Sequence, residues 1–116
     1  MSAGQTCGSA RETTDATVAV IDELILDIVE KTEIAENLIE RMQWAGIHNR
    51  FRRLRSVLIG IRRQYSGTPA SIEDVLSSLH QDIAHIATQM DTATACDDAL
   101  SDLEEAAACL PRPSQN

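Results

Sequence analysis

The sequence predicts an all-α protein, an antiparallel helical bundle or long helical hairpin of about four helices with coiled-coil-like packing. Apolar residues recur at alternating steps of four and three along most of the chain, which is the spacing of one helix face. Only Trp44, Phe51 and Tyr65 are aromatic, so the core is aliphatic and suits packed helices better than a β-sandwich. Charge is also segregated: six arginines and no acid lie between Gly46 and Ser66, and the flanking segments are acidic.

We expect a single helical domain over residues 13–110, between disordered tails at 1–12 and 111–116. A chain of 116 residues, 43% of them hydrophobic, suffices for one domain with a real core. Residues 1–12 are small and polar, and Pro111 and Pro113 end the last periodic segment. The sequence shows no membrane span and no secretory signal, and its three cysteines have no CxxC spacing. We therefore expect a cytoplasmic protein.

The first helix is expected over residues 14–45. Thr13, Thr14 and Asp15 offer N-cap oxygens just ahead of an apolar stripe. The acidic residues of this segment lie mostly on the opposite side of the helix. At 1.5 Å per residue the helix would be about 45 Å long. The stripe consists of Ile21, Ile25, Ile28, Thr32, Ala35, Ile39 and Met42.

The second helix is expected over residues 47–65, after a break or kink near Gly46. Glycine costs a helix about 1 kcal/mol relative to alanine. The stripe that follows is also turned by about 100° from the first, so one straight helix would face two directions. A continuous helix over residues 14–65 is the alternative. The second stripe consists of Ile47, Phe51, Leu54, Leu58, Ile61 and Tyr65.

The third and fourth helices are expected over residues 71–91 and 95–110. Glycine and proline in the segment 66–69 stop the second helix. The change of phase after Met90 separates the last two helices, and Thr94 is the expected cap of the fourth. One arm over residues 71–110 is the alternative. The stripes are Ile72, Leu76, Leu79, Ile83, Ile86 and Met90, then Cys96, Leu100, Leu103, Ala107 and Leu110.

The arginine-rich helix is the best candidate for a binding site. Arg52, Arg53 and Arg63 lie opposite its apolar stripe, and Arg55 and Arg62 lie at the border of that stripe. The arginine fork binds carboxylates and phosphates through two parallel hydrogen bonds. Because the rest of the chain is acidic, we expect these side chains to pair with an acidic helical surface, on a protein partner or within the same assembly.

These features predict a non-enzymatic interaction module, such as a small adaptor, a chaperone or a regulatory subunit. The first helix is longer than its expected partners, and this mismatch predicts a homodimer. Trp44 falls on the acidic side of the first helix, where it is expected as an apolar anchor for a partner. Burial of that helix on two sides is the alternative. Nucleic acid is a second kind of partner, disfavoured by the net charge of -8 and by the lack of stacking aromatics on the arginine face.

We expect no catalytic residue, no metal site and no cofactor. His80 and His85 lie five residues apart, about 140° around a helix, so they do not chelate one ion. Glu33, Glu36 and Glu40 form an acidic ladder, but no second ladder follows an apolar edge. The sequence contains no nucleophile motif, no phosphate-binding glycine loop and no zinc spacing.

The tripeptide Trp44-Ala45-Gly46 resembles the W-x-G turn of the WXG100 family, small helical hairpins exported by type VII secretion. As in that family, the tripeptide follows a first long helix in a chain of similar length. The resemblance implies a secreted helical hairpin that turns at these residues. The sequence departs from the family pattern after the second helix, where Tyr65 is followed four residues later by Pro69 instead of an acid.

Overall fold

The computed structural model describes residues 2–64 and 70–110, with side chains over 14–63 and 72–110. The described residues form four helices and no strand, so the predicted all-α class is confirmed. The helices are α1 (Ser2–Ile34), α2 (Leu38–Gln64), α3 (Ala70–Thr88) and α4 (Ala93–Ala108).

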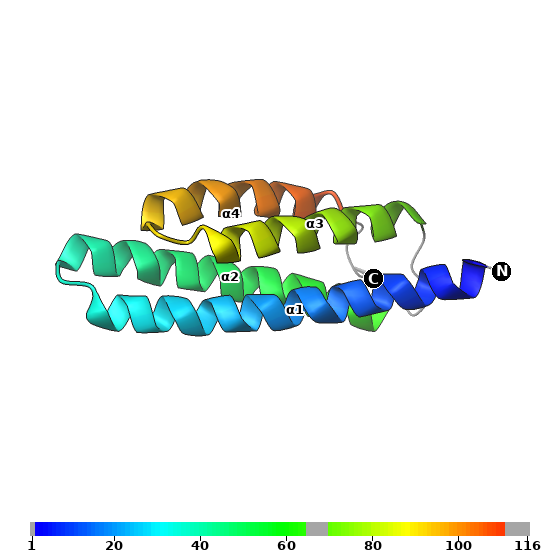
Figure 1. Ribbon diagram of the computed structural model, residues 1–116, viewed down its shortest axis with the longest axis horizontal. Coiled ribbons are helices and arrows are strands. Elements are labelled where there is room, and N and C mark those ends of the chain that lie inside the picture. The colour runs from blue at the N-terminus through cyan, green and yellow to red at the C-terminus, as the bar shows by residue number, and fades with distance from the viewer. Residues whose placement is uncertain (1, 65–69, 111–116) are drawn as a thin grey trace, which may run out of the picture.

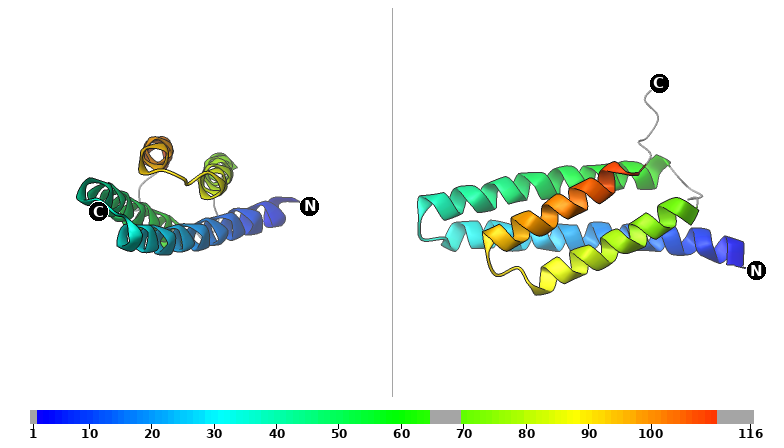
Figure 2. Two further views of the ribbon diagram at one scale, coloured as in Figure 1. Left: turned by 60° about the vertical axis from the view of Figure 1, so that its left-hand side comes forward. Right: turned by 90° about the horizontal axis from the view of Figure 1, so that it is seen from above.

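The helices form two stacked hairpins. In Figure 1, α1 and α2 lie antiparallel in one layer, and α3 and α4 lie antiparallel in a second layer. Helix α1 packs on α2 and α3, and α4 packs on α2 and α3, so the four helices close a ring around one core. Figure 2 shows that the second layer crosses the first at an angle. Because α3 and α4 are shorter than α1 and α2, the turn between α1 and α2 extends beyond the turn between α3 and α4 (Figures 1 and 2).

The core is built from the predicted aliphatic stripes. Every described member of the second, third and fourth stripes is buried, which confirms those three stripes. A fully buried aliphatic side chain contributes roughly 1.5–3 kcal/mol, so these stripes are the main source of stability. Helix α1 adds Val18, Ile21, Leu24 and Ile28 to this core. A single chain therefore covers most of its own apolar stripes, and the length mismatch that predicted a dimer applies only to the end of the first hairpin.

The predicted break near Gly46 is wrong, because the chain turns at residues 35–37. The side-chain Oδ1 of Asn37 accepts a hydrogen bond from the backbone N–H of Glu40 at 2.7 Å, which is N-cap geometry for α2. The Nε of Arg41 donates to the carbonyl oxygen of Ala35 at 2.9 Å and closes the turn. The expected first stripe ran through this turn because its spacing continues without interruption.

The earlier turn moves Trp44 from the surface into the core. Because α2 begins at Leu38, Trp44 becomes the first member of the α2 stripe, three residues before Ile47, and is only 3% exposed. The Nζ of Lys31 lies 5.8 Å from the centre of its ring. Trp44 is thus not a surface anchor. The tripeptide that begins with it lies within α2 and not in the turn that the WXG100 resemblance implies.

Two further boundaries differ from the expectation. Helix α4 is capped by Thr92 instead of Thr94, since the Oγ1 of Thr92 accepts a hydrogen bond from the backbone N–H of Ala95 at 3.1 Å. Helix α1 begins at Ser2, within the segment 1–12 that was expected to be a disordered tail. No proline interrupts that segment, so the backbone hydrogen-bond ladder runs through it. The predicted tail at 111–116 lies outside the described residues.

Gly46 has no packing role within the chain. It is exposed in the N-terminal half of α2, and no atom of a neighbouring element lies within 4 Å of the place where a Cβ would stand. We predict that Gly46→Ala raises the free energy of unfolding in dilute solution by about 0.5–1 kcal/mol, measured by urea denaturation followed by circular dichroism. Ala45→Gly, at the neighbouring exposed position, should lower it by a similar amount. A loss of stability in Gly46→Ala would contradict this assignment.

Cys96 is a core side chain. It is 1% exposed, and burial raises the pKa of its thiol to about 11. Because the thiolate is the reactive form, a raised pKa and burial both suppress reaction. We predict that a thiol-reactive dye at about pH 8 labels the exposed Cys109 and leaves Cys96 unlabelled until urea unfolds the chain. Peptide mass spectrometry assigns the label, and rapid labelling of native Cys96 would be inconsistent with this core.

Candidate functional site

The six arginines between Arg50 and Arg63 divide into two sets by their position around α2. Three lie at the flanks of the helix, where it meets α4 or α1, and each of these pairs with carboxylates of the same chain. The other three point away from the core and pair with no described residue. The flanking set is Arg50, Arg55 and Arg62, and the outward set is Arg52, Arg53 and Arg63.

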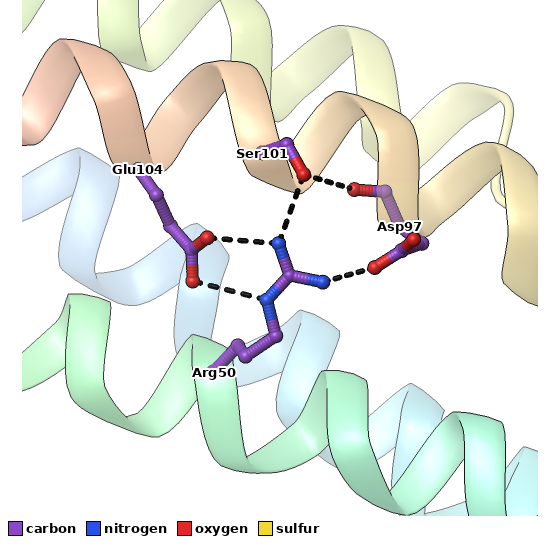
Figure 3. Close-up of polar contacts among 4 residues, drawn as sticks. All are labelled: Arg50, Asp97, Ser101 and Glu104. Carbon is purple, nitrogen blue, oxygen red and sulfur yellow. Dashed lines mark hydrogen bonds and ion pairs between the residues drawn. The ribbon is translucent and has the colours of Figure 1, made fainter.

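Arg50 joins α2 to α4 through one cluster of polar side chains (Figure 3). Its Nη2 donates to Glu104 Oε1 at 2.8 Å and its Nε to Glu104 Oε2 at 3.1 Å, which is a bidentate pair. The Nη2 also donates to Ser101 Oγ at 3.1 Å, and the Nη1 pairs with Asp97. The hydrogen bond to Glu104 is the largest cause that raises the pKa of Arg50 above its usual range.

The Arg50 cluster links α2 to α4, a pair of helices that pack on each other less extensively than α1 and α2 do. Asp97, Ser101 and Glu104 follow one another at steps of four and three, so they share one face of α4. The Arg50 side chain is half-buried between them. Because the carboxylates remain partly exposed, we assign the cluster only about 1 kcal/mol of stability. Sequence analysis did not single out Arg50, since a helical wheel does not show which flank of a helix meets an acid.

Arg55 and Arg62 join α2 to α1. The Nη1 of Arg62 donates to Asp15 Oδ1 at 2.6 Å, and the Nε of Arg55 donates to Asp22. The two arginines are seven residues apart, and so are the two aspartates, which is the expected match for antiparallel helices two turns along. The Arg62–Asp15 pair is exposed and the Arg55–Asp22 pair is only part-buried, so each contributes little to stability. Both side chains, predicted for partner binding, thus pair with acids of their own chain.

Arg52, Arg53 and Arg63 are the part of the predicted site that stays on the surface. All three are exposed, and none forms an ion pair with residues 14–63 or 72–110. Arg53 lies at the rim of an apolar hollow of about 200 Å³ between α2 and the end of α4. Apolar parts of this hollow come from Leu54, Val57, Gly60, Ile61, Ala107, Ala108 and Leu110.

A second surface lies at the far end of the first hairpin, and we call it the apolar tip. Its four side chains are Ile34, Leu38, Ile39 and Met42, which are 71%, 71%, 71% and 65% exposed. Glu33, Glu36 and Glu40 surround the tip, are exposed, and form no ion pair with any described residue. Sequence analysis missed this surface because it assigned Ile39 and Met42 to the core. The signal that could have revealed it is Asn37, a preferred N-cap residue.

No group of three or more His, Cys, Asp or Glu side chains is placed to hold a metal ion in the described part of the chain. The Nδ1 of His80 lies 3.3 Å from the Oγ1 of Thr17, between α3 and α1. No described helix is long and apolar enough to cross a membrane.

Comparison with family models, curated proteins and solved structures finds no match to this chain. Two surfaces of the described residues bear on the function. One is the outward arginine set on α2, and the other is the apolar tip with its acidic surroundings.

We predict that Arg50→Gln lowers the free energy of unfolding by about 1 kcal/mol, because α4 loses its bidentate contact with α2. Urea denaturation in dilute solution measures this change. Arg50→Lys should fall between wild type and Arg50→Gln, since lysine keeps the charge but not the fork. The matched control is Arg53→Gln on the outward face, which should leave stability unchanged. Equal effects of the substitutions at Arg50 and Arg53 would refute the distinction between flanking and outward arginines.

Proposed function

We propose that this chain is a non-enzymatic protein-interaction module that uses the outward face of α2 to pair with an acidic helical surface, and that it works as a homodimer. The observation that carries the proposal is the exposure of Arg52, Arg53 and Arg63 without a carboxylate partner among the described residues. We place the module in the cytoplasm, a compartment that keeps exposed thiols such as Cys109 reduced.

The flanking arginines support the kind of partner proposed. Each of them meets an aspartate or glutamate on a neighbouring helix of the same chain. The outward arginines carry the same group on the same helix, and their forks suit carboxylates that a second helix presents at steps of three and four. Charge pairing of this sort selects a partner and speeds encounter more than it adds affinity. This behaviour fits an adaptor, a chaperone or a regulatory subunit.

The test replaces all three outward arginines with glutamine. We expect Arg52→Gln/Arg53→Gln/Arg63→Gln to lose protein partners, untagged copies of the chain among them, that the tagged wild type retains from an extract of its native host at physiological salt. Quantitative mass spectrometry measures the retained proteins. The physical reason is that the partner's acidic side chains lose their hydrogen-bond donors and remain desolvated at the contact.

The matched control is Ser78→Glu/Gln81→Glu/Gln89→Glu, which changes the net charge by the same three units at exposed positions on or next to α3. This variant should keep the wild-type set of retained proteins. If the wild type and both variants retain the same proteins, the outward face of α2 is not the binding surface.

Nucleic acid is the second candidate partner, and one observation favours it. Arg52 and Arg53, with Asn49 and Ser56, line a shallow hollow of about 600 Å³ between α1 and α2, where phosphate oxygens would find several donors, although the carboxylate-bearing Asp22 also lines it. The net charge of -8 opposes it. Under our proposal DNA and RNA migrate unchanged in a gel-shift assay at low salt. If the wild type retards DNA or RNA and the triple glutamine variant does not, the outward arginines bind nucleic acid and not an acidic protein surface.

A further inference from the structure

Helix α2 carries a second stripe on the side away from its core contacts. Seven residues recur there at alternating steps of three and four, the spacing of a two-helix seam. None of them belongs to the buried core, and most are exposed. We call this set the outer seam, and it consists of Ile39, Met42, Gly46, Asn49, Arg53, Ser56 and Gly60.

The two halves of the outer seam have complementary shapes and charges. The N-terminal half presents the large side chains of Ile39 and Met42, next to the exposed carboxylate of Glu36. The C-terminal half presents small residues at Ser56 and Gly60, beside the apolar hollow of about 200 Å³. The outward arginines lie along this half. The N-terminal half therefore presents protruding apolar side chains beside a carboxylate, and the C-terminal half presents an apolar hollow beside arginines.

We propose that the outer seam is an interface between two copies of this chain, with their α2 helices antiparallel about a two-fold axis close to Asn49. This inference rests on the proposed function and identifies a second copy of the chain as the partner. An axis between Asn49 and Arg50 sets Ile39 of one copy opposite Gly60 of the other. It also brings Glu36, in the turn just before α2, near Arg63 of the other copy. Because the axis is a two-fold, each of these contacts forms twice.

This register also accounts for Gly46. In the second copy Arg53 stands opposite Gly46, where no atom of a neighbouring element lies within 4 Å of the missing Cβ. A further hollow, of about 250 Å³, includes Gly46 and the carboxylate-bearing Asp97 among its lining residues. A long guanidinium side chain entering over a glycine finds room there, and Asp97 supplies negative charge. Within one chain, this glycine has no comparable explanation.

The length and polarity of α2 favour the same arrangement. Its 27 residues span about 40 Å, which is enough for a seam of several heptads. Antiparallel helices place the negative end of one macrodipole beside the positive end of the other. An isologous pair also closes on itself and covers Ile39 and Met42 of both copies at once, whereas a head-to-tail contact of the same surfaces would leave these side chains uncovered in one copy.

The first experiment tests the surface. We expect Ile39→Glu/Met42→Glu to raise the dimer dissociation constant at least about tenfold, because two charges enter the seam at each of two contacts. Sedimentation equilibrium over a range of concentrations measures the constant. The matched control is Leu26→Glu on α1, where the side chain is 69% exposed and lies outside the outer seam. This control should dimerise as the wild type does.

The second experiment tests the antiparallel register by charge exchange at low salt. Glu36→Arg alone and Arg63→Glu alone should each weaken dimerisation about tenfold, since each replaces two attractions by two repulsions. An equimolar mixture of the two variants should form a heterodimer with affinity near that of the wild type. A misfolded variant would not be rescued by mixing, so the mixture separates loss of fold from loss of contact.

Three results would overturn the interface. They are a wild type that stays monomeric at high micromolar concentration, a dimer that Ile39→Glu/Met42→Glu leaves intact, and single variants that weaken the dimer without recovery on mixing. A monomer that still retains acidic proteins through Arg52, Arg53 and Arg63 would refute this inference and the homodimer, and would leave standing the proposed pairing of the outward arginines with an acidic partner. Conversely, a dimer with the predicted charge exchange but no further arginine-dependent partner would confine the function to self-association.

Discussion

The register of the α1–α2 hairpin is the constraint on which the rest of the structure depends. The turn that Asn37 caps starts α2 at Leu38, and this start places Trp44 on the core side of the helix. The same register brings Arg55 to Asp22 and Arg62 to Asp15. A shift of one residue would rotate α2 by about 100°, expose the Trp44 ring and separate both ion pairs. Burial of Trp44 and the core stripe favours this register most strongly, and the two ion pairs, which are largely exposed, add little.

The register of this hairpin determines which sides of α2 are covered by other helices and which side is exposed. Helix α2 meets α1 along one flank and α4 along the other, where Arg50 bridges to Glu104. Its remaining side faces away from both, with the outward arginines and the outer seam. The second hairpin is shorter than the first, because α3 and α4 have 19 and 16 residues against 33 and 27. The apolar tip consequently lies beyond the ends of α3 and α4, and neither helix covers it. We therefore propose that this end takes part in an interface.

Much of the fold could be predicted from the sequence, because the stripes from Ile47 onward keep one phase within each helix and are interrupted by proline, glycine or threonine. The turn at 35–37 could not, since the apolar spacing runs through it to Ile39 and Met42. Ile39 and Met42 are exposed because α3 and α4 end before they reach this part of α2, and this cannot be read from the spacing. The site was predicted in part. Charge segregation indicated pairing of arginines with acids, but the division between flanking and outward arginines depends on which helices lie beside α2.

We propose that α2 has two seams, an inner one closed within the chain and an outer one closed by a second copy. Isotope-filtered NMR on a mixture of labelled and unlabelled chains tests this most directly, because it detects only contacts between copies. We expect contacts from the Met42 methyl group of one copy to the Val57 methyl groups of the other, because an axis between Asn49 and Arg50 sets these two residues opposite each other. Contacts between copies that arise only from α3, or no such contacts at a concentration where the chain is dimeric, would contradict it.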